Sequence, residues 1–363
     1  MWRPYDAGMT PRTPQPTPQP PVSDKPVKRR MLMSIGLGLL LLLILSGCAR
    51  DDASGEGCAK AGGSGTCEVD GFGDRPYVVF LPSSFDPAEQ IPVVLGLHGG
   101  GGRAAPHLTC PGGDESDPLC LHGVGESEGF ITVYPNGTGF RPLRGIRTWN
   151  AGGGADGWNC SSGKACEQAV DDLGYIDAVL ADLSRSATLD TNRIYATGLS
   201  NGAAMSHRLA CERSDVFAAV VAVAGSNQFA TAAQCEPSRP ISVMQIHGTA
   251  DPCWEYETSD RACLGSNGRK MGALESSEGW AEINGCTDHV EGLITDAEPD
   301  ATSVQVATWS ACEGRVEVSL LTVHGGGHTW PNGDPGLDRL VGEVSTEIDS
   351  STIWEFMSRW TLE

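Results

Sequence analysis

Short, nearly continuous apolar runs recur along the chain, separated by polar and glycine-rich segments. They cover residues 77–82, 91–98, 130–135, 217–225, 241–247 and 316–323. Runs of this length without polar alternation are typical of strands buried on both faces, as in parallel sheets. Apolar residues at helical spacing in 169–183 and 353–360 predict helices. The pattern therefore predicts an α/β fold, with a mostly parallel central sheet and helices on both of its faces.

The segment 193–205 predicts a strand, a sharp turn and a helix in immediate succession. An apolar run enters Gly198-Leu199-Ser200-Asn201-Gly202, and an alanine-rich helical pattern leaves it. A serine on such a turn holds its hydroxyl clear of the sheet, and the glycines avoid clashes with neighbouring backbone. With 47 glycines in the chain, the pentapeptide alone also fits an ordinary glycine-rich turn. The flanking strand and helix favour Ser200 as a nucleophile.

Four consecutive glycines, Gly99 to Gly102, follow the apolar run 91–98. Backbone N–H groups in a loop without side chains can converge on one point and stabilise an oxyanion. We expect the N–H groups of Gly100 and Asn201 to form this oxyanion hole. A flexible glycine turn is the alternative interpretation of these four residues taken alone.

Two later loops carry the candidate acid and base. Asp251 follows the run 241–247, at the strand end where open parallel sheets gather active-site groups. An aspartate before proline is also a common turn residue. If the base follows the acid in the chain, it is His289, His324 or His328. We select His328, because it follows three glycines and can reach inward, whereas His324 ends a strand and His289 lies in a polar loop.

Two tryptophans, Trp149 and Trp330, are candidate substrate-cleft residues. Trp149 precedes a glycine-rich loop, and Trp330 comes two residues after His328. Burial in the core is the alternative for Trp149. Asp171 and Asp172 begin the predicted helix 169–183, and we expect them to stabilise its N-terminus without taking part in chemistry.

The N-terminal part of the chain has the composition of an export signal. Residues 28–30 are basic, and the mostly apolar run 31–45 is too short to span a bilayer comfortably. The run ends in Leu45-Ser46-Gly47-Cys48, which resembles the lipobox of bacterial lipoproteins and implies lipidation of Cys48. The alternative is a secreted protein with Cys48 in a disulfide. We expect an extracytoplasmic protein with a signal peptide that has a long n-region (1–47), a lipid-anchored flexible tether (48–71) and one catalytic domain (72–363).

Twelve cysteines remain besides Cys48, an even number that favours disulfides in an exported chain. Their spacing suggests six local pairs, although sequence alone does not fix connectivity. These are Cys58 with Cys67, Cys110 with Cys120, Cys160 with Cys166, Cys211 with Cys235, Cys253 with Cys263, and Cys286 with Cys312. A zinc site is the rival interpretation, which the absence of close C-x₂-C pairs from the sequence disfavours.

The net charge of −21 disfavours nucleic acid and other anionic partners. We expect a monomer that contacts the membrane through its lipid anchor only. No metal or organic cofactor is expected, because a serine, a histidine, an aspartate and backbone N–H groups supply all the groups that acyl transfer requires.

The chain resembles the esterase family that contains polyhydroxybutyrate depolymerases and feruloyl esterases, within the α/β-hydrolases. The resemblance covers roughly residues 75–360. Its motifs are Leu97-His98-Gly99, Tyr134-Pro135, Trp149-Asn150, Val170-Asp171-Asp172, Gly198-Leu199-Ser200-Asn201-Gly202, His247-Gly248-Thr249-Ala250-Asp251 and Gly326-Gly327-His328-Thr329-Trp330-Pro331.

This resemblance implies an α/β-hydrolase esterase domain with Ser200, Asp251 and His328 as its triad. The implied substrate is a carboxylic ester, such as one in feruloylated plant polysaccharide or a polyhydroxyalkanoate. Three alternatives stay open: an acetyl xylan esterase, a peptidase of the prolyl oligopeptidase type, and an inactive binding lipoprotein of the same fold.

Overall fold

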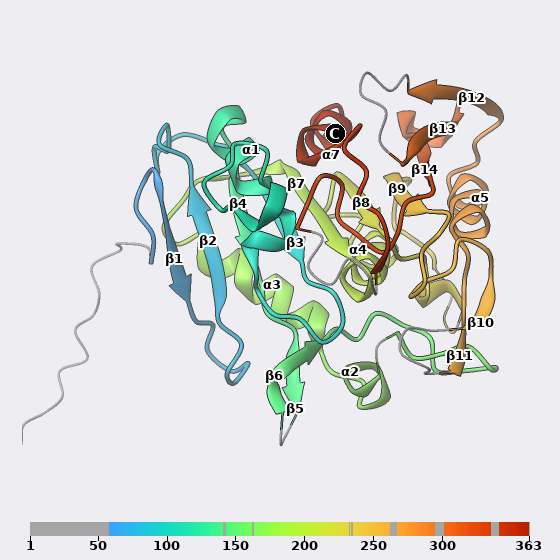
Figure 1. Cartoon of the computed structure of the whole chain (residues 1–363). Helices are drawn as coiled ribbons and strands as arrows, with labels where there is room; N and C mark the ends of the chain where they lie inside the picture. The colour runs from blue at the N-terminus through green and yellow to red at the C-terminus, as the bar shows by residue number, and fades with distance from the viewer. Residues whose placement is uncertain are drawn as a thin grey trace, which may run out of the picture. The chain divides into compact units, whose positions relative to one another are not determined.

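A ten-stranded sheet runs through the computed structural model of the protein (Figure 1). The structure describes residues 58–362, except 141–142, 162, 232, 234, 262–266, 295–300 and 335–340. All of these belong to one contact unit, Ala53–Glu363. The predicted signal peptide and Cys48 lie outside the described residues.

The sheet has the order β1-β2-β4-β3-β7-β8-β9-β14-β13-β12. Its strands are β1 Gly63–Cys67, β2 Tyr77–Leu81, β3 Ile91–Leu97, β4 Ile131–Tyr134, β7 Leu189–Leu199, β8 Ala219–Val223, β9 Ser242–Gly248, β12 Asp288–Ile294, β13 Ser303–Ser310 and β14 Val318–His324. The central strands from β4 to β14 pair in parallel, whereas β1 and β2 at one edge and β13 and β12 at the other pair antiparallel. The carboxyl ends of the parallel strands therefore meet at one edge of the sheet.

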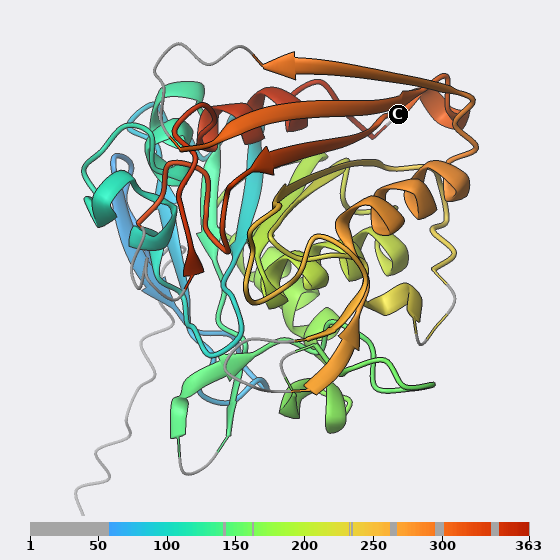
Figure 2. The same ribbon diagram turned by 45° about the vertical axis from the view of Figure 1, so that its right-hand side comes forward.

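Helices cover both faces of this sheet (Figures 1 and 2). On one face, α3 (Asp172–Leu183), α4 (Asn201–Glu212) and α5 (Ala273–Ile283) share a core with Val93 and Leu95 of β3. On the other, α1 (Leu121–Glu128) and α7 (Ser350–Met357) share a core with Val94. Successive residues of a strand point to opposite faces, so a continuous apolar run fills two cores.

Shorter elements complete the described part of the chain. They are β5 (Thr138–Phe140) paired with β6 (Leu143–Thr148), β10 (Ser259–Arg261) paired with β11 (Asn267–Lys270), α2 (Lys164–Glu167), and the 3₁₀ turns η1 (Pro106–Thr109), η2 (Pro111–Gly113), η3 (Phe229–Thr231) and η5 (Glu313–Arg315).

The predicted fold class, that of an α/β-hydrolase, is confirmed: each predicted apolar run contains a strand of the large sheet. The elements that were not predicted include β12, β13 and α5. Strand β12 lies at the sheet edge with Val290 and Leu293 exposed, and most of β13 is only partly buried. Neither strand therefore has a continuous apolar run. His289, which we placed in a polar loop, lies in β12 opposite Trp309.

Part of the predicted tether is folded, which corrects the boundary at residue 71. Gly63–Cys67 forms β1 and pairs antiparallel with β2. Cys67 is buried in the core and bonded to Cys58. A strand with three small residues offers little hydrophobic signal, so its composition resembles that of a linker.

Five of the six predicted disulfides are present: Cys58–Cys67, Cys110–Cys120, Cys160–Cys166, Cys211–Cys235 and Cys286–Cys312. Cys253 is also disulfide-bonded, but Cys263 lies outside the described residues. Among the helices of the described segments, none combines the length and apolarity needed to cross a bilayer.

A buried ion pair links Arg75, just before β2, to Asp172 at the start of α3. The Arg75 guanidinium donates to Asp172 Oδ1 at 2.5 Å and to the Asn136 carbonyl at 3.0 Å, and it stacks over the Tyr175 ring. The second Asp172 oxygen accepts from Asn150 N–H at 2.5 Å. Removing one partner of such a pair leaves the other charge buried without compensation.

We therefore expect Asp172→Ala to lower the free energy of unfolding by about 3–5 kcal/mol, because Arg75 would stay buried and unpaired. The neighbouring Asp171→Ala is the matched control. Asp171 caps α3 by accepting from Gly174 N–H, a contact worth about 1 kcal/mol. Urea unfolding of both variants measures the difference, and equal losses would contradict the prediction.

Candidate active site

Ser200 lies on a strained turn between β7 and α4. Its backbone has φ 58° and ψ −116°, a conformation that costs a non-glycine residue free energy and is typical of functional sites. Ser200 N–H donates to the Val223 carbonyl at 2.8 Å, which fixes the turn to the end of β8. The residue is partly exposed, so a substrate can approach the turn.

Three glycines allow the backbones around this turn to approach closely. A Cβ on Gly202 would clash with the Leu97 carbonyl, and one on Gly225 would clash with the Ser200 carbonyl. A Cβ on Gly198 would meet Gly202 itself. The turn therefore requires glycine at these positions, as the sequence pattern indicates.

The Asn201 side chain is fully buried and links the turn to the loop at Trp149. Its Oδ1 accepts from Trp149 N–H at 2.7 Å, and its Nδ2 donates to the Trp149 carbonyl at 3.1 Å and the Ser161 carbonyl at 3.0 Å. These bonds fix the first turn of α4, whose N-terminal N–H groups are the ones available to an anion.

The glycine turn after β3 lies directly beside Ser200. A Cβ built on Gly99 would lie 3.5 Å from the Ser200 Cβ. Gly101 N–H donates to the Arg147 carbonyl at 2.8 Å, and Gly102 N–H donates to the Gly99 carbonyl at 3.0 Å. Neither of these two N–H groups can bind an oxyanion without breaking a bond that shapes the turn.

The His98 ring stabilises this turn through two hydrogen bonds. Gly137 N–H donates to its Nε2 at 2.9 Å, so its Nδ1–H donates to the Gly99 carbonyl at 2.8 Å. Burial lowers the pKa of His98 to about 4, and the ring is neutral at pH 7. His98 is therefore a structural histidine of the turn.

Asp251 and His328 come together from the ends of β9 and β14. His328 Nδ1–H donates to Asp251 Oδ2 at 2.7 Å, which leaves Nε2 to accept a proton. The other oxygen of Asp251 accepts from Cys253 N–H at 2.7 Å and Trp254 N–H at 2.8 Å. The acid is thus immobilised and almost fully buried.

Burial alone would raise the pKa of Asp251, but the positive charge and hydrogen bond of His328 outweigh it, together with contributions from His247 and Trp254 N–H. The net effect holds the pKa of Asp251 below its ordinary value. An ionised carboxylate in this position orients an imidazole and stabilises its protonated form.

Two further side chains, those of His247 and Lys270, support the Asp251 loop. His247 is fully buried, and its Nε2–H donates to the Trp254 carbonyl at 2.7 Å. Lys270 Nζ donates to the Cys253 carbonyl at 3.1 Å and lies over the Trp254 ring, 4.6 Å from its centroid. Burial lowers the pKa of Lys270 to about 8. Sequence reasoning assigned neither residue a role: His247 was named only as part of the motif that ends in Asp251, and Lys270 lies in no motif.

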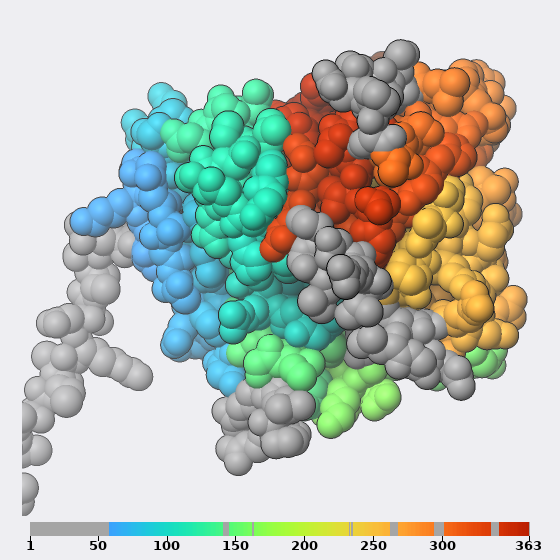
Figure 3. Space-filling view, viewed as in Figure 1, coloured from blue at the N-terminus to red at the C-terminus, as the bar shows by residue number. Residues whose placement is uncertain are grey.

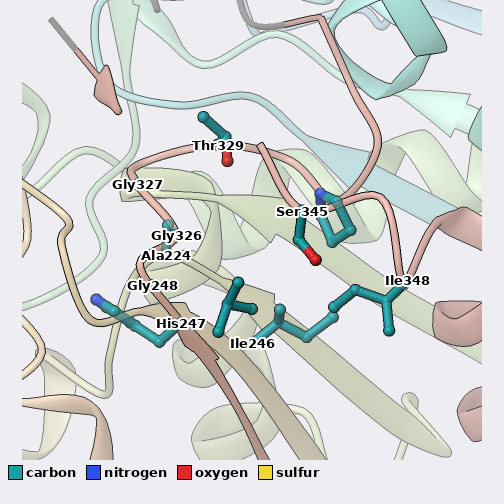
Figure 4. Close-up of a pocket in the computed structure, with 11 residues that line it drawn as sticks. Ala224, Ile246, His247, Gly248, Gly326, Gly327, Thr329, Ser345 and Ile348 are labelled. Atoms are coloured by element: carbon teal, nitrogen blue, oxygen red, sulfur yellow. The ribbon is translucent and has the colours of Figure 1, made fainter. Parts of the chain in front are cut away.

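The turn that carries His328 is tied to the segment behind it. Gly327 N–H donates to the Glu343 carbonyl at 2.9 Å, and His328 N–H donates to the Val341 carbonyl. A cavity of about 10 Å³ lies beneath this turn, bounded by Gly326 and Gly327 above the end of β9 and by Ile348 (Figure 4). It is at most the size of one water, so it is a packing void and not a substrate site.

The structure corrects one predicted cleft residue. Trp149 is fully buried in the core, where its indole N–H donates to the His98 carbonyl at 3.0 Å, so it cannot line a cleft. Trp330 is also largely buried, but it borders a cavity next to Gly99 and Leu199. His324, the alternative base, is exposed at the end of β14 and contacts Gln305.

Two groups of potential metal ligands occur in the described part of the chain. One joins Cys110, Cys120 and His122, and the other joins Cys253 to Asp251 and His328. All three cysteines are disulfide-bonded, which removes the thiolates that a metal would need. Neither donor set therefore fits a metal site.

Several known proteins are similar in sequence to this chain. The esterase NocK of Nocardia uniformis subsp. tsuyamanensis is 30% identical over 245 residues, 64% of this chain and 71% of NocK. Feruloyl esterase B of Piromyces equi is 26% identical, over 73% of this chain and 44% of that protein. The bifunctional acetylxylan esterase/xylanase XynS20E of Neocallimastix patriciarum is 22% identical, over 80% and 34%.

The chain thus spans less than half the length of the two fungal relatives. No protein-family model matches it. Among solved structures, an acetyl xylan esterase from Aspergillus awamori aligns with a TM-score of 0.47 at 15% identity, over 78% of this chain and 94% of that one.

The lowered pKa of Asp251 predicts a pH-dependent contribution to stability. Because the pKa is below its unfolded value of about 3.9, the ionised carboxylate stabilises the fold above that pH, and the contribution disappears as the pH falls through the folded-state pKa. The stability gap between wild type and Asp251→Asn should therefore be constant near neutrality and narrow below about pH 4. Urea unfolding from pH 7 to 3 measures it, with the exposed Asp70→Asn as control. A gap that stays constant to pH 3 would refute the assignment.

Proposed function

The chain belongs to the esterase family that includes NocK and is a carboxylic ester hydrolase, and from this premise we propose that it is an exported serine esterase with a Ser200, His328 and Asp251 triad. One observation carries the assignment of the base and the acid. The Asp251 carboxylate accepts from His328 Nδ1–H at 2.7 Å, at the same sheet edge as the strained Ser200 turn. The serine of a triad needs a base that is held by a buried acid in this way.

In the acylation step, His328 Nε2 accepts the Ser200 proton while Ser200 Oγ bonds to the carbonyl carbon of the ester. The tetrahedral oxyanion collapses, the carbon–oxygen bond to the alcohol breaks, and the alcohol leaves with the proton from His328. Asp251 keeps the imidazole in the required tautomer and stabilises the imidazolium. Water then repeats the sequence on the acyl-enzyme and releases the acid.

The oxyanion is stabilised by Gly100 N–H and Asn201 N–H. Gly100 follows Gly99, which lies against Ser200, while the next two N–H groups of the turn are engaged elsewhere. Asn201 is the first residue of α4, where N–H groups have no intrahelical acceptor. Positioned donors of this kind contribute several kcal/mol to catalysis, and the mechanism needs no metal or organic cofactor.

The substrate is a carboxylic ester of the kinds that this family's members cleave. Among the relatives, one is named a feruloyl esterase and another a bifunctional acetylxylan esterase/xylanase. Feruloyl esters and acetylated xylan are therefore both candidate substrates for this chain. Polyhydroxyalkanoate is a third candidate, from the sequence resemblance. These three differ in the size of the acyl group that the site must hold.

We also propose that the protein acts outside the cytoplasm, anchored by lipid at Cys48. The disulfides support an oxidising compartment. The basic and apolar composition before Cys48 supports export.

Ser200→Ala should reduce hydrolysis of p-nitrophenyl acetate by roughly a thousandfold or more while leaving the melting temperature unchanged, because it removes the nucleophile but little packing. His328→Ala should be comparably damaging, and Asp251→Asn somewhat less so. The control is His324→Ala, four residues before His328, which should keep wild-type kcat. An active His328→Ala together with an inactive His324→Ala would reassign the base.

Lipidation is tested by expressing the full chain in a bacterium that is fed an alkyne fatty acid. The wild type should become labelled and partition with membranes, because the Cys48 thiol is the lipid acceptor. Cys48→Ser should remain unlabelled, whereas the Cys286→Ser, Cys312→Ser pair should keep the label. An unlabelled wild type that is still exported would show a secreted protein.

A further inference from the structure

An apolar cavity lies between the oxyanion turn and the turn that carries His328. Its wall includes Leu97 and Gly99 from the end of β3, Leu108 from η1, Leu199 from the end of β7, and Trp330. Leu199 immediately precedes Ser200, and Gly99 lies against Ser200. The cavity is therefore lined by the residue that precedes Ser200 and by a residue that packs against it, while Ser200 itself is not part of the wall.

The two segments that form the outer wall meet at the molecular surface. In Figure 3 the teal segment that includes η1 and α1 borders the red C-terminal segment. The two segments are also hydrogen-bonded, because Ser350 Oγ donates to the Thr109 carbonyl at 3.4 Å. Leu108 and Thr109 line the cavity from the first segment, and Trp330 lines it from the other side.

The polar atoms around the cavity already have partners. Thr109 Oγ1 donates to the Pro106 carbonyl at 2.8 Å and contacts Tyr134 Oη at 3.2 Å. Both nitrogens of His98 are engaged with backbone groups. An occupant therefore gains little from a hydroxyl or a charge here, and an aliphatic group suits the cavity best.

The cavity is small. Its volume is about 20 Å³, whereas a single water needs about 10–15 Å³ and an engineered cavity that holds a benzene ring measures about 150 Å³. A methyl group fits this space. The phenolic ring of a feruloyl group does not, and neither does a long aliphatic chain.

Hydrogen bonds and a disulfide hold the wall in place. The Trp330 indole N–H donates to Ser350 Oγ at 3.1 Å. Leu108 N–H donates to the Ala105 carbonyl at 3.1 Å, and two residues later Cys110 is bonded to Cys120. Enlarging the cavity would require breaking these contacts, so its size limits the substrate.

We propose that this cavity is the acyl pocket of the esterase and that it restricts the enzyme to short acyl groups, chiefly acetyl, with Leu108 and Trp330 as specificity-determining residues. This inference rests on the proposed function and selects among its candidate substrates. The acetyl group bonds to Ser200 Oγ as the alcohol leaves, and water then releases it as acetate. The alcohol part of the ester points away from the cavity.

The test is a series of p-nitrophenyl esters of acetate, propionate, butyrate and hexanoate, together with methyl ferulate. One methylene too many in a fixed apolar pocket changes rates by about 10- to 200-fold. We therefore expect kcat/KM of the wild type to fall at least tenfold between acetate and butyrate, with no measurable turnover of methyl ferulate. If the wild type hydrolyses the hexanoate ester or methyl ferulate with a kcat/KM equal to that for the acetate ester, the inference is overturned. If Ser200→Ala then loses that activity, the proposed function still stands.

Leu108→Ala enlarges the pocket and should raise the ratio of kcat/KM for hexanoate over acetate by roughly tenfold or more. Leu274→Ala, an exposed leucine on α5, is the matched control and should leave the ratio unchanged. A purely structural role of Leu108 would lower all rates together and leave the ratio as it was, which would contradict the proposal. A wild type that hydrolyses none of the esters would overturn the proposed function itself.

Discussion

The close approach of three backbone segments beneath Ser200 constrains the whole site. Gly198, Gly202 and Gly225 allow the ends of β3, β7 and β8 to touch where any side chain would separate them. The contact forces Ser200 into a positive φ, whose cost is offset by the packing of the surrounding sheet. The position of the nucleophile therefore depends on the entire parallel centre of the fold, and not on the loop alone.

Asn201 extends this rigidity into the loops on one side of the site. Its amide holds both backbone groups of Trp149, and the next residue, Asn150, donates to the buried Asp172. The Arg75–Asp172 ion pair thus supports the same loop that the α4 turn holds. This coupling explains why Trp149 is a core residue. Its backbone is hydrogen-bonded to Asn201, and its indole N–H donates to the His98 carbonyl.

Sequence reasoning was most informative where one physical requirement dictates the residue type. Buried strands need continuous apolar runs, and the turn at Ser200 needs its glycines, so both were predictable. Trp149 was not, because an aromatic residue suits a cleft and a core equally well. Strand β1 was missed because small residues such as Gly63 give no hydrophobic signal, and the acyl cavity is formed by residues as distant as Leu108 and Trp330. Such contacts between separate segments have no local signature.

The acid loop shows how the remaining groups act together. Cys253 N–H and Trp254 N–H bind one oxygen of Asp251, while His247 and Lys270 hold the carbonyls of Trp254 and Cys253 from the outer side. Cys253 and Trp254 therefore each have both their N–H and their carbonyl group hydrogen-bonded. The carboxylate has no freedom to rotate away from His328, so the direction of the imidazole is set by buried hydrogen bonds and not by solvent.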